Sequence, residues 1–276
     1  MYIYKSCHST RLSFCASEQD IVLEKARTKL YYIKKKCYNA FMDKDFISTV
    51  SHELRTPLTS IRGFSQTMLN SWDKLDDETK KRFLKIIEEQ SNRLINLVEN
   101  MLSINKLQAQ KENLIYKESN LKLIIDPVIS IVKNTYPTHK YIFEHNEKTP
   151  NILIDRYKFQ QVMVNLVENA AKYSDEGTVI TIKTAPVGEN VSIKVIDNGI
   201  GIAEENYDKI FTKFSRIDNP LTRKVQGSGL GLYITKNLVE KMDGKISVKS
   251  ENGQTTFEIL MPVKSVEDQA RAKCNQ

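Results

Sequence analysis

The sequence has no long apolar run. None of its segments approaches the roughly 18 consecutive apolar residues that a membrane-spanning helix needs. The opening stretch, MYIYKSCHSTRLSF, also lacks the continuous apolar segment of a signal peptide. We therefore expect a soluble chain without a membrane span, although a longer parent protein could be membrane-bound.

Cysteine is scarce and scattered. The four cysteines, Cys7, Cys15, Cys37 and Cys274, contain no Cys-x-x-Cys pair, and no histidine lies at metal-ligand spacing from them. This pattern indicates neither a zinc site nor a disulfide framework, and it fits a reducing compartment. We expect a cytoplasmic protein.

Several nucleotide and nucleic-acid signatures are missing. There is no Walker A loop, and the hexapeptide GSGLGL at residues 227–232 is not a dinucleotide fingerprint, because its sixth residue is leucine and it follows a loop. The net charge is +7, yet aromatic residues are not interleaved with the basic ones and no nucleic-acid motif occurs. A nucleotide or an acidic protein explains the surplus charge better than a nucleic acid does.

The composition is that of an ordinary soluble protein, with 276 residues, 40% hydrophobic and 27% charged. The patterns divide the chain into four parts: a partly helical N-terminal segment (1–39), a helical hairpin (40–108), a domain of alternating elements (109–264) and a polar tail (265–276). The first part is too short for a recognisable sensor domain. Its helical pattern from residue 18 carries a basic run at 34–36, which is either a solvated face or a helix beside a membrane surface.

One predicted helix carries a histidine. In residues 46–64, FISTVSHELRTPLTSIRGF, apolar residues recur every three or four positions and would line one face, and His52 lies off that stripe. Pro57 removes one intrahelical hydrogen bond and predicts a bend just after the histidine. We expect this helix to reach about residue 70. A second helix, at 78–106, has coiled-coil spacing, and a homodimer forming a four-helix bundle would cover the apolar faces of both helices.

The remainder alternates between strand and helix patterns. We expect helices at 121–134, 156–173 and 230–242, and strands at 114–117, 140–145, 152–154, 178–184, 191–196, 245–250 and 255–261. Residues 185–190 (APVGEN) and 251–254 (ENGQ) predict turns between the last two pairs of strands.

The helix at 156–173 has a polar face on which Asn165, Asn169, Lys172 and Tyr173 lie at helical spacing. This face is either solvated or meets a ligand. Amide oxygens suit a magnesium ion that keeps several waters and bridges substrate phosphates, and a lysine beside it would neutralise phosphate charge. Residues 227–232 open a later helix, so their backbone amides can also face phosphate.

Five strings, in this order, resemble the sequence boxes of bacterial two-component sensor histidine kinases. They are HELRTPL (52–58, phosphoacceptor box), NLVENAAKYS (165–174, N box), DNGIG (197–201, G1 box), FTKFSR (211–216, F box) and GSGLGL (227–232, G2 box). The resemblance covers residues from about 40 to 263. It implies an α+β chain, in which a dimeric helical hairpin is followed by an α/β two-layer sandwich of the GHKL ATPase type.

The resemblance implies a role for each matching residue. His52 would accept a phosphoryl group from ATP, Glu53 would take the proton from the histidine ring, and Glu53 with Thr56 would position water for removing phosphate from a response regulator. In the ATP site, Asp197 would accept a hydrogen bond from the adenine amino group, a role that suits an acceptor-only carboxylate. The other implied contacts are Asn169 and Asn165 to Mg²⁺, Lys172 to phosphate, Tyr173 to the nucleoside, Arg216 to the γ-phosphate, Gly199 and Gly201 in the G1 turn, and Gly227, Gly229 and Gly231 at phosphate and at one end of a closing lid.

The expected activity is therefore ATP-dependent phosphorylation of His52, followed by transfer to an aspartate on the receiver domain of a response regulator. Two alternatives remain open from the sequence. A GHKL ATPase that couples ATP to conformational change would leave His52 unmodified, and a dimeric scaffold would not use ATP. The sequence does not decide whether phosphorylation occurs within one subunit or between the two.

Overall fold

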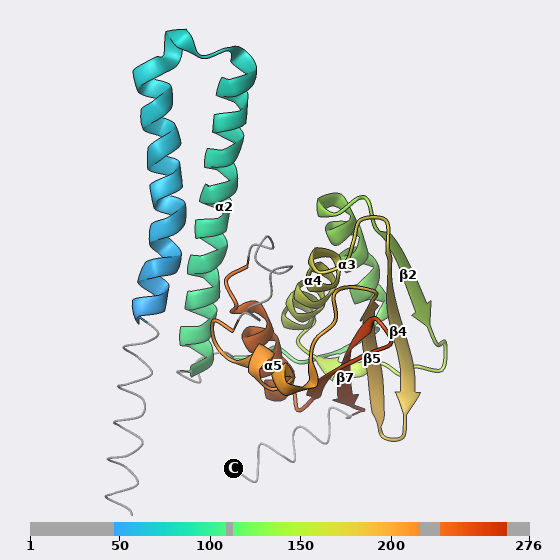
Figure 1. The fold of residues 1–276 in the computed structure, drawn as a ribbon. Helices are drawn as coiled ribbons and strands as arrows, with labels where there is room; N and C mark the ends of the chain where they lie inside the picture. The colour runs from blue at the N-terminus through green and yellow to red at the C-terminus, as the bar shows by residue number, and fades with distance from the viewer. Residues whose placement is uncertain (1–46, 109–112, 216–226, 264–276) are drawn as a thin grey trace, which may run out of the picture. The chain divides into compact units, whose positions relative to one another are not determined.

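The computed structural model describes residues 47–108, 113–215 and 227–263 (Figure 1). The helical pattern predicted from residue 18, the basic run at 34–36, Arg216 with the rest of residues 216–226 of the predicted lid, and the tail at 265–276 lie outside the described residues. Within the described ranges, no helix has both the length and the apolar character needed to cross a membrane.

The first described part is a helical hairpin. One helix occupies residues 47–71, a short 3-10 turn η1 (Trp72–Lys74) follows, and α2 spans Asp77–Gln108. The rings of Phe64 and Phe83 meet across the hairpin with their centroids 5.0 Å apart. The predicted pair of long helices is confirmed, with boundaries displaced by one or two residues.

Asp76 fixes the start of α2. Its two carboxylate oxygens accept hydrogen bonds from the backbone amide and the hydroxyl of Thr79, each at 2.8 Å. A side-chain acceptor at this position satisfies an amide that has no partner within the helix. These two bonds lower the pKa of Asp76, because they favour its charged form.

The second part is an α/β domain. Its elements in chain order are β1 (Lys117–Ser119), α3 (Lys122–Thr135), β2 (Lys140–His145), β3 (Ile152–Ile154), α4 (Arg156–Lys172), β4 (Val179–Val187), β5 (Asn190–Asp197), η2 (Glu204–Asn206), η3 (Lys209–Phe211), α5 (Gly231–Lys241), β6 (Lys245–Glu251) and β7 (Gln254–Pro262). A five-stranded sheet has the order β2-β4-β5-β7-β6, with β2 parallel to β4 and the other pairs antiparallel. β1 and β3 form a separate antiparallel pair.

Helices α3, α4 and α5 lie against one face of this sheet (Figure 1). Alternate residues of the central strands, such as Ile193 and Val195 of β5 and Ile259 of β7, are almost fully buried, and so are Val162 and Leu166 of α4. The two-layer sandwich predicted from the family resemblance is therefore confirmed. The layer of apolar side chains between α4 and the sheet positions the polar ends of both.

The bounds of the strand predicted at 114–117 are wrong, because β1 occupies Lys117–Ser119 and shares only Lys117 with the prediction. The two residues before it are held by other contacts. The amide of Ile115 donates to Asp155 Oδ2 at 2.8 Å, and the hydroxyl of Tyr116 donates to the carbonyl of Lys241 at 2.8 Å. These tertiary bonds, which come from distant positions, override the local strand pattern.

Both predicted hairpin turns are too long. β4 continues through Val187, so that Pro186 pairs with Val191 and only Gly188 and Glu189 form the turn. Proline is tolerated there because β2 pairs with β4 only as far as Thr184, which leaves one side of β4 without a neighbour. In the other hairpin the turn is Asn252-Gly253, and both residues have positive φ, as a two-residue type I′ turn requires.

Candidate functional site

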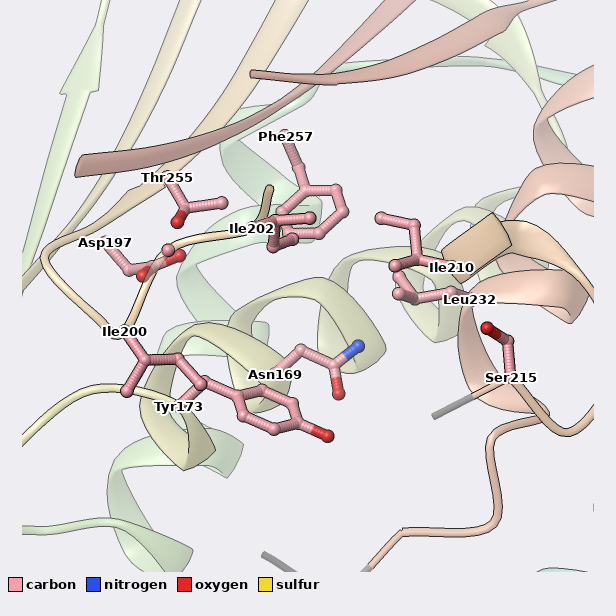
Figure 2. Close-up of a pocket in the computed structure, with 11 residues that line it drawn as sticks. Asn169, Tyr173, Asp197, Ile200, Ile202, Ile210, Ser215, Leu232, Thr255 and Phe257 are labelled. Atoms are coloured by element: carbon pink, nitrogen blue, oxygen red, sulfur yellow. The ribbon is translucent and has the colours of Figure 1, made fainter. Parts of the chain in front are cut away.

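A pocket lies between α4, the start of α5, the ends of β5 and β7, and the loop that follows β5 (Figure 2). Its polar lining consists of Asn169, Tyr173, Asp197, Ser215 and Thr255. Its apolar lining consists of Ile200, Ile202, Ile210, Leu232 and Phe257. A mainly apolar pocket with a few converging polar groups is the usual form of a small-molecule site.

Asp197 ends β5 and is the charged group of the pocket, with only 4% of its surface exposed. Its Oδ1 accepts hydrogen bonds from the Gly199 amide at 2.9 Å and from the Ser174 hydroxyl at 3.5 Å. Burial raises the pKa of Asp197 to about 6, although both of these bonds act to lower it. A buried carboxylate in this condition favours a ligand that donates a hydrogen bond to it.

The turn after Asp197 is fastened to the end of α4. The amide of Ile200 donates to the carbonyl of Tyr173 at 3.1 Å. A Cβ atom at Gly199 would collide with that carbonyl and would lie 2.7 Å from Asp197 Oδ1. Glycine is therefore required at position 199 for the turn to approach α4 this closely, whereas Gly201 is required for its φ of +74°.

Helix α4 supplies Asn169 and Tyr173 to the pocket. Asp155 caps the other end of α4, since its Oδ1 accepts from the amides of Tyr157 and Lys158, both at 3.1 Å. Lys172 is half-buried and is not among the pocket-lining residues. Of the four polar residues predicted on one face of this helix, two therefore line the pocket directly.

Asn165, one turn before Asn169, joins α4 to α5. Its Nδ2 donates to the hydroxyl of Thr235 at 2.8 Å. A Cβ atom at Gly231, the first residue of α5, would collide with the Asn165 amide. The amide nitrogen of Asn165 is thus committed to holding the start of α5 beside α4.

The glycines before α5 bring this segment against the loop at the other side of the pocket. Gly229 has a φ of +66°, and a Cβ atom there would lie 2.7 Å from the carbonyl carbon of Phe214. Phe214 itself has a positive φ of 57°. Gly227 is half-buried, and Leu232, in the first turn of α5, lines the pocket.

His52 lies on the helix at residues 47–71, with its side chain exposed. Glu53 beside it is half-buried, and Thr56 is exposed. The Thr56 hydroxyl donates to the carbonyl of His52 at 3.3 Å, which is a local bond within the helix. The histidine is therefore held on a regular helix and is open to solvent.

Thr255 was not predicted as a site residue, although it is only 3% exposed and lines the pocket. It pairs with Asp197 across the β5–β7 ladder, which brings two polar residues together on the face that meets the helices. A signal was present in the sequence. The alternation of residues 255–261 places Thr255 on the same strand face as Phe257 and Ile259, so a hydroxyl on an otherwise apolar face marked the position.

Comparison with known proteins identifies two family domains. The pattern of the His Kinase A (phospho-acceptor) domain matches residues 42–110. The pattern of the histidine kinase-, DNA gyrase B- and HSP90-like ATPase matches residues 154–265. His52 lies in the first match, and all the residues that line the pocket lie in the second.

Two relatives are similar over most of this chain. The sensor protein kinase WalK of Staphylococcus aureus is 34% identical over 228 residues, which are 82% of this chain and 55% of the relative. The signal transduction histidine-protein kinase ArlS of Staphylococcus haemolyticus is 32% identical over 244 residues, which are 88% of this chain and 53% of the relative. The chain thus spans about half the length of these relatives.

Solved structures of histidine kinases share the fold. AdeS of Acinetobacter baumannii has a TM-score of 0.61 at 25% identity, covering 78% of this chain and 98% of its own. ThkA, solved in complex with the response regulator protein TrrA, has a TM-score of 0.66 at 27% identity, covering 86% of this chain and 66% of that one. With its two family domains in order, the chain belongs to the two-component sensor histidine kinases and carries their transmitter region, a phosphoacceptor helical hairpin followed by an ATP-binding domain.

Proposed function

We propose that this chain is an ATP-dependent protein-histidine kinase that phosphorylates itself on His52 and passes the phosphoryl group to an aspartate of a response regulator. The observation that carries the proposal is the pocket built around buried Asp197 in a chain whose phosphoacceptor domain presents an exposed His52. We assign phosphotransfer to residues 40–108 and catalysis to 109–264, which the two family matches support.

The pocket suits the adenine of ATP. Asp197 offers an acceptor at the buried end, and adenine carries an amino group that donates. The isoleucine side chains of the lining and the ring of Tyr173 offer apolar surface to a planar base and its sugar (Figure 2). The turn with Gly199 and Gly201 brings the backbone close enough to complete this wall.

The residues present fit magnesium. Asn169 would hold the ion through its amide oxygen, and Asn165 could add its own Oδ1, since its Nδ2 is bonded to Thr235. In the described ranges no cluster of three His, Cys, Asp or Glu side chains forms a complete metal site. The amide oxygens of Asn169 and Asn165 are a small donor set, which suits an ion that takes most of its ligands from phosphate and water. Bound magnesium would neutralise charge on the phosphates.

The remaining side chains of the site act on charge and position, which is how phosphoryl transfer is mainly catalysed. Lys172 and Arg216 would contact phosphate oxygens, and the amides of Gly227, Gly229 and Gly231 lie at the N-terminus of α5, where anions bind favourably. The neutral ring nitrogen of His52 attacks the γ-phosphorus as the bond to the β-phosphate oxygen breaks, and ADP leaves with that electron pair. Glu53 takes the proton released from the other ring nitrogen.

The hairpin is proposed to dimerise. Several of its apolar side chains are about half exposed in one copy, namely Leu58, Leu84, Ile95, Val98 and Leu102. A second hairpin would cover them in a four-helix bundle. The complex of ThkA with a response regulator supports docking of a receiver domain on this chain as well.

The test is incubation of the full chain with γ-labelled ATP, comparing wild type with His52→Gln. Acid-labile, alkali-stable label in the wild type, lost by more than a thousandfold in His52→Gln, is expected. ADP affinity should stay within twofold, since His52 is outside the pocket lining. Undiminished label in His52→Gln would refute the proposal, and ATP hydrolysis without any labelled protein would favour an ATPase that acts through conformational change.

We also propose that Thr56 and Glu53 position water for dephosphorylation of the regulator. The hydroxyl of Thr56 is exposed and makes only a long bond of 3.3 Å within the helix, so it can turn to another partner. Thr56→Ala should keep autophosphorylation within twofold and lose about tenfold or more of the dephosphorylation of a purified phosphoregulator. Unchanged dephosphorylation by Thr56→Ala would contradict this role.

A further inference from the structure

The loop between β5 and η3 is tied to the edge of the sheet by a tyrosine outside the pocket. The hydroxyl of Tyr207 accepts a hydrogen bond from the Ser250 amide at 2.6 Å and donates to the Ser250 carbonyl at 3.3 Å. Ser250 belongs to β6, the edge strand of the sheet, beyond which the described part of the chain places no further strand. One phenol therefore satisfies both backbone groups of Ser250 at this edge.

The side chain of Ser250 continues the connection to the pocket. Its Oγ accepts from the Ile202 amide at 3.1 Å and lies 3.1 Å from the hydroxyl oxygen of Thr255. Ile202 and Thr255 both line the pocket (Figure 2). A Cβ atom at Gly201 would lie 3.2 Å from Ser250 Oγ, so the glycine lets the loop approach this closely. Neither Tyr207 nor Ser250 is among the lining residues.

The hydrogen bond between the Ser250 and Thr255 hydroxyls can run in either direction, and donation by Ser250 is the direction that leaves a hydrogen of Thr255 for the pocket. The Ser250 hydroxyl has one hydrogen and two lone pairs, and the Ile202 amide occupies one lone pair. When Ser250 gives its hydrogen to Thr255, the Thr255 hydroxyl keeps its own hydrogen for the pocket. The pocket then presents a donor at Thr255 near the acceptor at Asp197, its partner across the β5–β7 ladder.

This arrangement matches one purine better than another. Adenine presents a donor, its amino group, next to an acceptor, its N1 atom. Hypoxanthine presents the reverse pair, an acceptor oxygen next to an N1–H donor. A fixed acceptor and donor pair in the pocket would therefore select adenine, whereas a Thr255 hydroxyl that turned freely would serve either base.

We propose that Tyr207 and Ser250 are positioning residues for base recognition: Tyr207 fixes Ser250 at the sheet edge, and Ser250 fixes the Thr255 hydroxyl and the Ile202 backbone in the pocket. The inference rests on the proposed nucleotide-binding function and names two residues that act on it without touching the nucleotide.

The test measures ADP and IDP affinity of the 276-residue chain by competition against a fluorescent nucleotide. Ser250→Ala should weaken ADP binding about fivefold to tenfold and IDP binding by less than twofold, so that the preference for ADP falls. Tyr207→Phe should lower the preference for ADP over IDP about threefold. Ser250→Thr should retain the wild-type preference, because it keeps the hydroxyl. A purely structural loosening would weaken both nucleotides alike.

Matched controls come from the same chain. Ser247→Ala changes an exposed serine of the same strand, and Tyr157→Phe changes a tyrosine that is 82% exposed; both should leave the preference unchanged. Autophosphorylation should show a raised KM for ATP in Ser250→Ala, with the rate at saturating ATP within twofold of wild type. Thermal unfolding verifies the fold of each variant, and Tyr207→Phe alone decides the matter should Ser250→Ala fail to fold.

Two results would overturn the proposal. One is an unchanged ratio of ADP to IDP affinity in a folded Ser250→Ala or Tyr207→Phe variant while the wild type binds ADP and labels His52, which leaves the proposed function intact. The other is a wild-type chain that binds no ADP, which removes the proposed function along with this inference.

Discussion

The exposed histidine and the buried aspartate are built in opposite ways. His52 stands in solvent on one continuous helix, and the groups proposed to act with it, Glu53 and Thr56, lie within one turn. Asp197 is 4% exposed, and the pocket around it draws on α4, α5, β5, β7 and a loop between them. The difference separates two demands: a nucleophile that must meet several partners needs access, whereas base recognition needs a desolvated, fixed acceptor.

The largest expected effect that tests this comparison is that of Asp197→Asn. Loss of the charged acceptor should weaken ADP binding by about tenfold to a hundredfold, as expected for a hydrogen bond to a charged group. The unliganded fold should gain on the order of 1–3 kcal/mol at pH 7, because the raised pKa of about 6 means that burial disfavours the carboxylate. Isothermal titration and thermal unfolding measure the two effects.

The decisive outcome for Asp197→Asn is weaker ADP binding together with a more stable unliganded fold. A variant that binds ADP as well as the wild type would show that the carboxylate is not the base acceptor. As a control, His52→Gln should change neither quantity appreciably, because the exposed histidine pays no desolvation cost in the fold.

The pH dependence of binding separates the two regions next. Asp197 has a pKa near 6 in the unliganded fold, so below pH 6 the protonated form prevails and the proton must leave before the carboxylate can accept from adenine. ADP affinity should therefore fall about tenfold per pH unit below 6 and level off above 7. Titrations of wild type and Asp197→Asn between pH 5 and 8 measure this.

The same group changes the stability of the unliganded protein in the opposite sense. Its folded pKa lies above the unfolded value of 3.8, so its stabilising contribution is fully present below about pH 3.8 and is lost as the pH rises through 6. Asp197→Asn should remove the pH dependence of ADP affinity and this pH dependence of stability. Persistence of the binding profile in that variant would assign it to another group.

A smaller expected effect is the change in stability when a glycine is replaced by alanine, once beside the pocket and once on the helix that carries His52. Gly231→Ala places a Cβ against the Asn165 amide and should cost about 1–3 kcal/mol of stability as overpacking does. Gly63→Ala, on the helix at 47–71, should stabilise the fold by about 0.5–1 kcal/mol through helix propensity, because the added Cβ has no described atom within 4 Å apart from its own helix backbone. Thermal unfolding of the two variants measures these changes in stability. Equal changes would show that the Asn165 amide does not restrict the side chain at position 231.

The two regions also differed in how far the sequence could predict them. The helical hairpin followed from periodicity alone, because its contacts are local or between neighbouring helices. The resemblance placed Asn169, Tyr173 and Asp197 in one site, and all three line the pocket. Their assigned roles stay predictions.

What the sequence did not predict depends on pairing between distant segments. Thr255 reaches the pocket because β7 lies antiparallel to β5, a register that no local pattern encodes. The contacts of Ile115 and Tyr116 displaced β1 for the same reason, since their partners lie 40 and 125 positions away. Tyr207 and Ser250 are 43 positions apart, and their connection is visible only in the folded chain.

The joint between α4 and α5 has an evolutionary consequence. Asn165 bonds Thr235 and fills the space that a side chain at position 231 would need. The three positions are therefore free to change only together: a larger residue at 231 requires a shorter one at 165, and that change leaves the buried hydroxyl of Thr235 in need of a new partner. In related chains, positions 165, 231 and 235 should therefore change together, even though β4, β5 and the segment after them separate position 165 from the other two in the chain.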